Sequence, residues 1–200
     1  MPRTIRCGSS PSFSKTFQIL SMLFLVTACQ TKKVEEKNEK HYYDLKGFVE
    51  NQIVYLEEKK PEVSKTAVLN GKSEQIKTKD IDWKKELELF VQADINKPSY
   101  RISYNVSRRD SAEYEYKLKP EMQATVQYLK IVTDSVVNQP VYIKAILKSE
   151  NRIYKSEKTI ELRCAQINNL WQVSSFSVDG YQKLIFTDKK SFHITSKIGF

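Results

Sequence analysis

The chain has 200 residues, with 33 Lys and Arg against 24 Asp and Glu, which gives a formal net charge of +9 at pH 7. One domain is the natural expectation for this length, and a domain of this size buries a core without disulfides or metals to hold it together. The cations are interspersed with acids instead of forming one dense strip, so the charge argues against a nucleic-acid partner.

The first 28 residues have the layout of a secretory signal peptide. They contain three cations and no acid, and residues 17–26 form a mostly apolar run that the small residues Thr27 and Ala28 follow. A membrane-spanning helix needs about 20 apolar residues, so this run is too short to cross a bilayer. We therefore expect residues 1–28 to be a signal peptide that is removed from the mature protein.

The segment Val26-Thr27-Ala28-Cys29 resembles the lipobox of bacterial lipoproteins, in which an aliphatic residue and two small residues precede a cysteine. The resemblance covers the signal peptide and Cys29. It implies cleavage between Ala28 and Cys29, and acylation of Cys29 with fatty acids such as palmitate. Two or more acyl chains hold a protein stably on a membrane, so the expected partner of Cys29 is the membrane itself.

The residues after Cys29 indicate where the anchored protein lies. In the sorting scheme of Gram-negative lipoproteins, a non-acidic residue such as Gln30 directs the protein to the outer membrane. The pair Glu35-Glu36 is similar to acidic export signals of surface-exposed lipoproteins, so the periplasmic side and the cell surface both stay open. Residues 30–41 contain one aliphatic residue, too few to order by burial. We expect residues 29–41 to be a lipidated, flexible tether before a single domain at 42–200.

Two amphipathic helices are predicted in the first half of this domain, with a hairpin between them. Residues 42–59 and 80–95 repeat apolar side chains at three- and four-residue steps. Pro61 and Pro98 end these helices, and Asp80 or Asp82 is suited to cap the second. Within residues 63–78, Asn70-Gly71 predicts the turn of a small, exposed hairpin.

From residue 99 onward the apolar pattern changes to a period of two, which predicts half-buried strands. A change of phase after Tyr128 indicates either a β-bulge or a strand that is buried on both faces at its end. Asp179-Gly180 indicates a tight turn. The predicted strands are residues 99–107, 112–119, 124–134, 141–148, 154–164, 171–178, 181–187 and 192–198.

This order of elements predicts an α+β fold. Helices that precede a run of strands with short connections favour an antiparallel meander of about seven main strands with the helices on one face. Because many strands tend to curl, we expect a curved sheet that forms a half-barrel around the two helices.

The sequence predicts neither an enzyme nor a cofactor or metal site. Its two histidines, His41 and His193, have no ligand-rich neighbours, and its glycines are scattered instead of forming a phosphate-binding loop. No nucleophile elbow is present. Cys164 is in phase with Ile160 and Leu162 in the period-two pattern, which is typical of a small buried apolar residue on a strand.

Two hypotheses for the function follow from different classes of protein. The first is a non-enzymatic structural or interaction domain with a partner in the cell envelope. The second is a carrier or chaperone that holds a lipid or acyl chain between helices and curved sheet, and its lining residues would be Tyr100, Tyr104, Tyr114, Tyr116 and Tyr128. Aromatic residues also favour strands and fill cores, which suits the first hypothesis.

The domain also resembles uncharacterised cell-envelope lipoproteins of Gram-negative bacteria. The resemblance is carried by Tyr43-Asp44-Leu45-Lys46 in the first helix, Asn70-Gly71-Lys72 in the hairpin and Trp83-Lys84-Lys85-Glu86-Leu87 in the second helix. It implies no activity.

Overall fold

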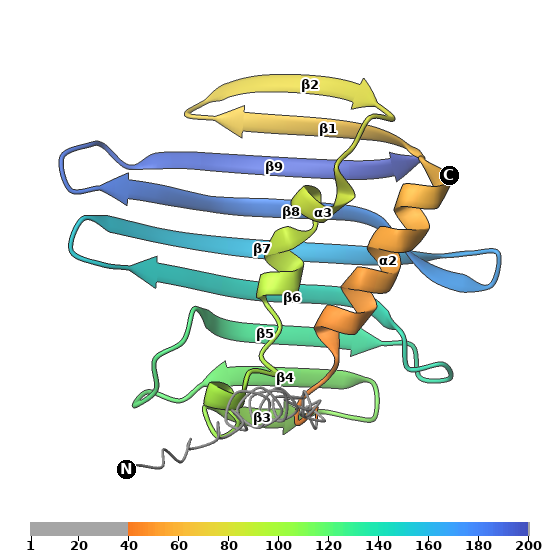
Figure 1. The fold of residues 1–200 in the computed structure, drawn as a ribbon, viewed down its shortest axis with the longest axis horizontal. Coiled ribbons are helices and arrows are strands. Elements are labelled where there is room, and N and C mark those ends of the chain that lie inside the picture. The colour runs from red at the N-terminus through yellow and green to blue at the C-terminus, as the bar shows by residue number, and fades with distance from the viewer. Residues whose placement is uncertain (1–39, 200) are drawn as a thin grey trace, which may run out of the picture. The chain divides into compact units, whose positions relative to one another are not determined.

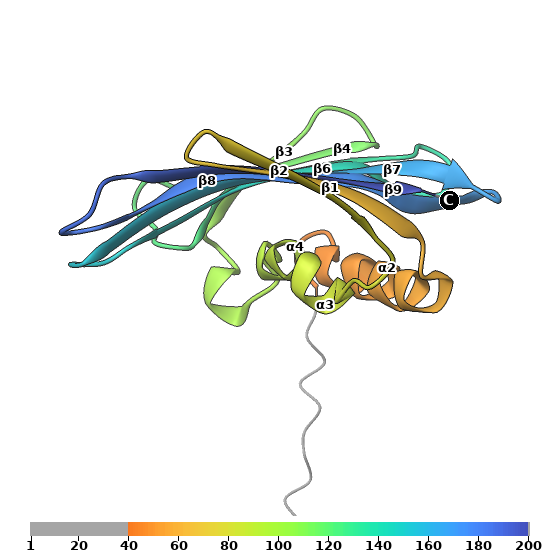
Figure 2. The same ribbon diagram turned by 90° about the horizontal axis from the view of Figure 1, so that it is seen from above.

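Helices cover one face of a single antiparallel sheet in the computed structural model, which describes residues 40–199 (Figures 1 and 2). The α-helices within this range are α2 (Leu45–Lys59), α3 (Trp83–Glu86) and α4 (Glu88–Gln92), and a short 3-10 helix, η2, spans Pro98–Tyr100. The described residues belong to one compact unit, Lys40–Phe200. The α+β class predicted from the order of elements is confirmed.

The sheet has nine strands in the order β2-β1-β9-β8-β7-β6-β5-β4-β3, and every neighbouring pair is antiparallel. Seven of them, β3 to β9, form a meander, as the period-two pattern predicts. The strands are β1 (Glu62–Leu69), β2 (Lys72–Thr78), β3 (Tyr104–Arg108), β4 (Glu113–Leu118), β5 (Val126–Thr133), β6 (Pro140–Glu150), β7 (Tyr154–Ile167), β8 (Leu170–Leu184) and β9 (Lys190–Gly199).

The hairpin of β1 and β2 belongs to the main sheet, whereas the sequence predicts a small separate hairpin. Asn70 and Gly71 form its turn with positive φ, as predicted. Strand β1 then pairs with β9 along its whole length, from Glu62 opposite Gly199 to Leu69 opposite Phe192. A short-range turn signal identifies the hairpin but carries no information about this distant pairing.

The predicted half-barrel is wrong, because the sheet is neither closed nor strongly curled. A barrel closes only when its outermost strands pair. Here β2 and β3 are the two edges of the sheet and seven strands lie between them. The helices occupy the face toward which the sheet would have to curl (Figure 2).

Helix α2 confirms the first predicted helix. Asp44 caps it, with its carboxylate accepting a hydrogen bond of 3.0 Å from the backbone N–H of Gly47. Its apolar stripe is fully or nearly fully buried against the sheet through Leu45, Val49, Ile53 and Leu56. Only five residues of α2 are buried, which leaves the opposite side of the helix exposed.

The second predicted helix is present in two pieces. Asp82 caps α3 by accepting a hydrogen bond from the backbone N–H of Lys85 at 3.2 Å. The helical pattern then breaks at Leu87 and resumes in α4. Trp83, Leu87 and Phe90 are nevertheless all buried, as the apolar spacing predicts.

Two strand boundaries differ from the prediction. Residues 99–107 are not one strand, because Pro98 starts the short helix η2 and β3 begins only at Tyr104. Asp179-Gly180 is not a turn, since β8 runs through both residues. An added Cβ on Gly180 would lie 2.4 Å from the carbonyl oxygen of Glu157 on β7. Glycine therefore allows close approach of the neighbouring strand here.

The predicted bulge in β5 is confirmed, because the pairing with β6 shifts between Val126 and Tyr128. This shift places the extra residue, Gln127, between two side chains that lie on opposite faces of the sheet. Val126 and Leu129 are both buried on the helix side, and Tyr128 points to the other face, which we call the open face.

Candidate functional site

The predicted lipidation and cleavage sites lie outside the described residues. Ala28, Cys29 and the signal peptide all precede residue 40, and of the predicted tether only Lys40 and His41 are described. These assignments therefore stay predictions from the sequence.

Four of the five candidate ligand-lining tyrosines lie on the helix side of the sheet, near the edge formed by β3 and β4, where α2 begins. Tyr104 and Tyr116 are buried and face the ring of Tyr42 edge-on, with ring centroids 5.8 and 5.4 Å apart. Tyr100 packs edge-on against Tyr104 at 6.1 Å, and Tyr114 packs at a tilt on Tyr43 at 5.4 Å. These rings therefore pack against one another and against the core.

Tyr128 does not belong to this group, because the bulge in β5 turns it to the open face. Its hydroxyl is hydrogen-bonded to Glu115, and burial followed by this hydrogen bond raises the pKa of Tyr128 to about 12. The phase change in the sequence signals the bulge but does not show which residue is the extra one.

The hydroxyls of the buried tyrosines hold backbone segments together. Tyr42 donates toward the carbonyls of Tyr100 and Arg101 at 2.9 Å, and Tyr104 donates to the carbonyl of Val126 at 2.9 Å. Burial raises the pKa of Tyr104, so this hydroxyl keeps its proton. Because the hydroxyls of Tyr42 and Tyr104 are engaged in this way, the tyrosine cluster has a structural role beneath the start of α2.

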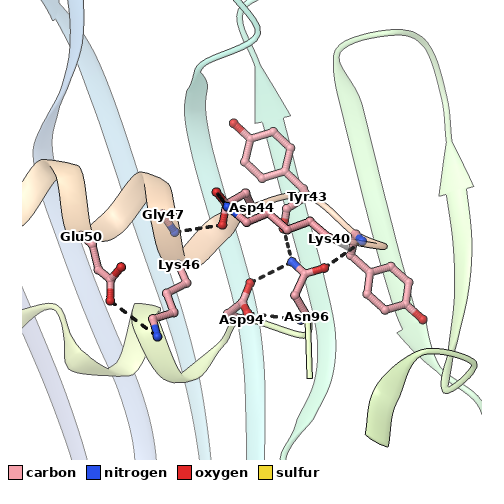
Figure 3. A network of polar contacts seen from close by, with 9 residues as sticks. Lys40, Tyr43, Asp44, Lys46, Gly47, Glu50, Asp94 and Asn96 are labelled. Atoms are coloured by element: carbon pink, nitrogen blue, oxygen red, sulfur yellow. Dashed lines mark hydrogen bonds and ion pairs between the residues drawn. The ribbon is translucent and has the colours of Figure 1, made fainter. Parts of the chain in front are cut away.

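A polar network beside the tyrosine cluster holds the backbone that leads into α2 (Figure 3). Asn96 accepts a hydrogen bond from the backbone N–H of Tyr42 and donates to the carbonyl of Tyr43, both at 2.9 Å. Asp94 accepts a second hydrogen bond from the Asn96 amide at 3.1 Å. The Lys40 ammonium pairs with Asp44, the cap of α2. The network satisfies local backbone groups, so its chemistry is structural.

The space between helices and sheet is filled by large apolar side chains. Leu45, Leu56 and Phe90 from the helices and Leu87 between α3 and α4 are fully buried. Their neighbours in the sheet include Leu129, Ile131, Ile143, Ile160 and Leu162. A hollow of about 250 Å³ lies between α4 and the ends of β6 and β7, but it is open to solvent and includes Lys158, Ser156 and Gln92 in its lining.

The open face carries rows of charged and aromatic side chains across the middle of the sheet. Lys130 pairs with Glu113 at 2.8 Å, Lys144 with Glu161 at 2.9 Å and Lys148 with Glu157 at 3.1 Å. The hydrogen bond from Lys144 lowers the pKa of Glu161. The Arg163 guanidinium lies 4.8 Å from the centre of the Tyr142 ring. Paired in this way, the side chains form an ordered polar surface.

Asp179, His193 and Thr195 form a hydrogen-bonded chain on the same face. Asp179 on β8 lies opposite His193 on β9 and contacts its Nδ1, while Nε2 of His193 lies 3.0 Å from the Thr195 hydroxyl. An acid, an imidazole and a hydroxyl in this order resemble a nucleophile with its base. The side chains of Asp179 and His193 are each half exposed, so water surrounds the chain.

Sequence reasoning misses this chain of residues because it places a turn at Asp179-Gly180. A signal for it does exist. Asp179 and His193 are both seven residues from Phe186, so a hairpin centred on Phe186 brings them opposite each other.

Cys164 packs against the core from β7, as its position in phase with Ile160 and Leu162 predicts. Burial raises the pKa of its thiol to about 12, so the sulfur is protonated at neutral pH. A thiolate is the nucleophilic form of cysteine, and this environment disfavours it.

Among residues 40–199, no three His, Cys, Asp or Glu side chains are grouped closely enough to hold a metal ion. The helices in that same range are all too short or too polar to span a membrane. No protein-family model matches the chain, and neither a curated protein nor a solved structure is detectably similar to it.

Proposed function

We propose that residues 40–199 form a non-enzymatic interaction domain, that a lipid on Cys29 holds this domain at the outer membrane, and that a protein partner binds the open face of the sheet. The observation that carries the proposal is the contrast between the two faces. The helix face is filled by the side chains of α2, α3 and α4, whereas no described segment covers the open face.

The composition of the open face supports a protein partner. Tyr128, Tyr142 and Arg163 lie there, and tyrosine and arginine are enriched in protein interfaces. The ion pairs that join β4 to β5 and β6 to β7 hold long side chains in place before binding, which reduces the conformational entropy lost on association. The carrier hypothesis requires room for an acyl chain between helices and sheet, and the filled interface supports the interaction domain instead.

The Asp179-His193-Thr195 chain fits this proposal as a structural part of the open face. Catalysis by a hydroxyl also needs donors placed to stabilise the developing oxyanion and a site that excludes water. The two strands that carry this chain leave it half exposed on a flat surface.

The anchor is tested in cells by labelling with radioactive palmitate. The chain should incorporate the label, and Cys29→Ser should abolish it. Equal labelling of both chains would refute the lipid anchor.

The interaction surface is tested with a photo-crosslinking amino acid placed at single positions. Thr159 and Ser177 lie on the open face of β7 and β8, and Val54 lies on the exposed side of α2. We expect one adduct of constant size from Thr159 and Ser177 and none from Val54. Adducts from Val54 alone, or none from any position, would contradict the proposal.

A further inference from the structure

One end of the sheet carries an exposed apolar patch formed by two neighbouring connections, which we call the tip. The connection from β6 to β7 contributes Ile153. Leu184, the last residue of β8, adds to the patch, and the connection from β8 to β9 contributes Ile185 and Phe186. A backbone hydrogen bond of 3.0 Å from Ile185 to Ile153 joins the two segments. Figure 1 shows both connections at the same end of the sheet.

The side chains of the tip are unusually exposed for apolar residues. Phe186 is 93% exposed, Ile153 62% and Ile185 56%. Contiguous apolar surface of this kind marks a site of interaction with a protein or a membrane. Neither connection contributes these side chains to the core, so folding of the domain does not explain why they are apolar.

The charges around the tip are mainly positive. Residues 150–155 and 183–190 together contain five cations and two acids, a net charge of +3. Glu150, one of the acids, is paired with Lys155 at 3.1 Å. Aromatic and aliphatic side chains with Lys and Arg around them are the combination that binds the surface of an anionic bilayer.

We propose that the tip docks on an anionic membrane surface, with Phe186, Ile185 and Ile153 entering the headgroup region and Arg152, Lys183 and Lys189 contacting lipid phosphates. The inference rests on the proposed function, because a lipid on Cys29 would keep the domain at a membrane. Lys40 is the eleventh residue after Cys29, and eleven residues span at most about 40 Å. Docking of the tip would then orient the domain on the bilayer.

The first experiment measures sedimentation with vesicles of the mature chain, residues 29–200, carrying Cys29→Ser so that no acyl chain contributes. We expect it to bind vesicles that contain phosphatidylglycerol and to bind phosphatidylcholine vesicles much more weakly. Replacing both Lys183 and Lys189 by Gln should weaken binding by about fivefold for each charge removed, and added salt should weaken it too.

The matched control lies at the opposite end of the sheet, where Val136 is 87% and Val137 55% exposed in the connection between β5 and β6. The double variant Ile185→Ser and Phe186→Ser should lose binding on the order of tenfold or more, whereas Val136→Ser with Val137→Ser should leave it unchanged. Equal losses in both variants, or no loss in either, would overturn the proposal. Thermal unfolding of each variant checks that all of them are folded.

The second experiment uses the lipidated protein in vesicles and a tryptophan in place of Phe186. Its fluorescence, taken as the difference from the parent chain, should shift to shorter wavelength in anionic vesicles, while that of Val136→Trp should not. A tip that stays in water when the protein is anchored would overturn the proposal. So would concentration-dependent dimerisation through the tip without vesicle binding, because the patch would then be an interface between copies of the chain.

The outcomes separate this inference from the proposed function. If palmitate labels Cys29 and the open face crosslinks but the tip fails to bind vesicles, the proposed function stands and the membrane contact is refuted. Vesicle binding by the Cys29→Ser chain does not depend on the anchor, so it is measured even if labelling fails.

Discussion

Gln52 is a buried polar side chain on α2 that satisfies the backbone of β8 where its pairing is irregular. The pairing of β7 with β8 shifts between Arg163 and Cys164, which leaves Ser174 as the extra residue. Next to this bulge, the Gln52 amide donates to the carbonyl of Trp171 at 3.2 Å and accepts from the N–H of Val173 at 3.0 Å. One side chain thus replaces two hydrogen bonds that a regular ladder would supply.

We expect Gln52→Leu to lower the free energy of unfolding by about 2–4 kcal/mol, because two buried backbone groups lose their partners. Urea denaturation measures this difference. Asn51→Leu is the control, since Asn51 lies next to Gln52 in α2 but is exposed. If the two variants are equally stable, the bridge to β8 contributes nothing.

Gly180 is the other position at which one residue determines local structure. An added Cβ would lie 2.4 Å from the carbonyl oxygen of Glu157 and 3.1 Å from the ring of Phe192. The first of these neighbours is backbone, so it cannot move aside without disturbing the pairing of β7 and β8.

Gly180→Ala should therefore destabilise the domain by about 1–3 kcal/mol through overpacking. Gly199→Ala is a suitable comparison, because its added Cβ would meet the Glu62 carbonyl at 3.4 Å, an ordinary contact. Thermal unfolding of both variants checks the prediction, and a tolerated alanine at 180 would contradict it.

At the scale of elements, the ion pair of Lys144 on β6 with Glu161 on β7 makes a contribution to stability that depends on pH. The hydrogen bond from Lys144 comes first among the causes that lower the pKa of Glu161, and a hydrogen bond from Tyr142 adds to it. A carboxyl whose pKa is lower in the folded state stabilises the fold above its unfolded pKa, and this contribution is lost as the pH falls through the folded value.

We expect Glu161→Gln to be less stable than the parent chain at pH 7 by at most about 1 kcal/mol, since the pair is partly exposed. The difference should shrink as the pH is lowered through and below the ordinary carboxyl pKa. Urea denaturation at a series of pH values measures it. A difference that does not change with pH would show that the charge of Glu161 is not the cause.

Element types could be predicted because they depend on local periodicity. The period-two runs in β4, β6 and β7 and the stripe of α2 place the right residues on the right faces. The signals that fail are those with more than one physical cause. Asp-Gly favours a turn, but Gly180 serves the close packing of β7 and β8, and Pro98 starts a short helix where alternation predicts a strand.

The candidate surfaces were less predictable than the elements. The open face follows from alternation, because a period of two predicts strands that are buried on one face and exposed on the other. The Asp179-His193-Thr195 chain requires the register of β8 and β9, which the wrong turn at residue 180 conceals. The tip requires knowing that two connections far apart in sequence lie together, a fact that no local pattern contains.

At the scale of the whole molecule, β1 connects the beginning of the domain to its end. It pairs with β9 on one side and β2 on the other, and Lys65 on β1 pairs with Glu86 on α3 at 2.6 Å. Val63 on β1 is buried and lies opposite Ile198. A hairpin integrated in this way should not unfold by itself, whereas the separate hairpin that the sequence predicts would.

Val63→Ala distinguishes these two arrangements. We expect a loss of about 2 kcal/mol that lowers the unfolding midpoint equally by two probes. Circular dichroism follows the sheet, and the fluorescence of buried Trp83, measured with Trp171 on β8 replaced by Phe, follows the helices. Val68→Ala, on the same strand but half-buried, should cost less. If the dichroism shows an early transition that the fluorescence does not, the hairpin opens independently. In that case β1 would be an appendage to the domain, and β9 would lose its partner before the core unfolds.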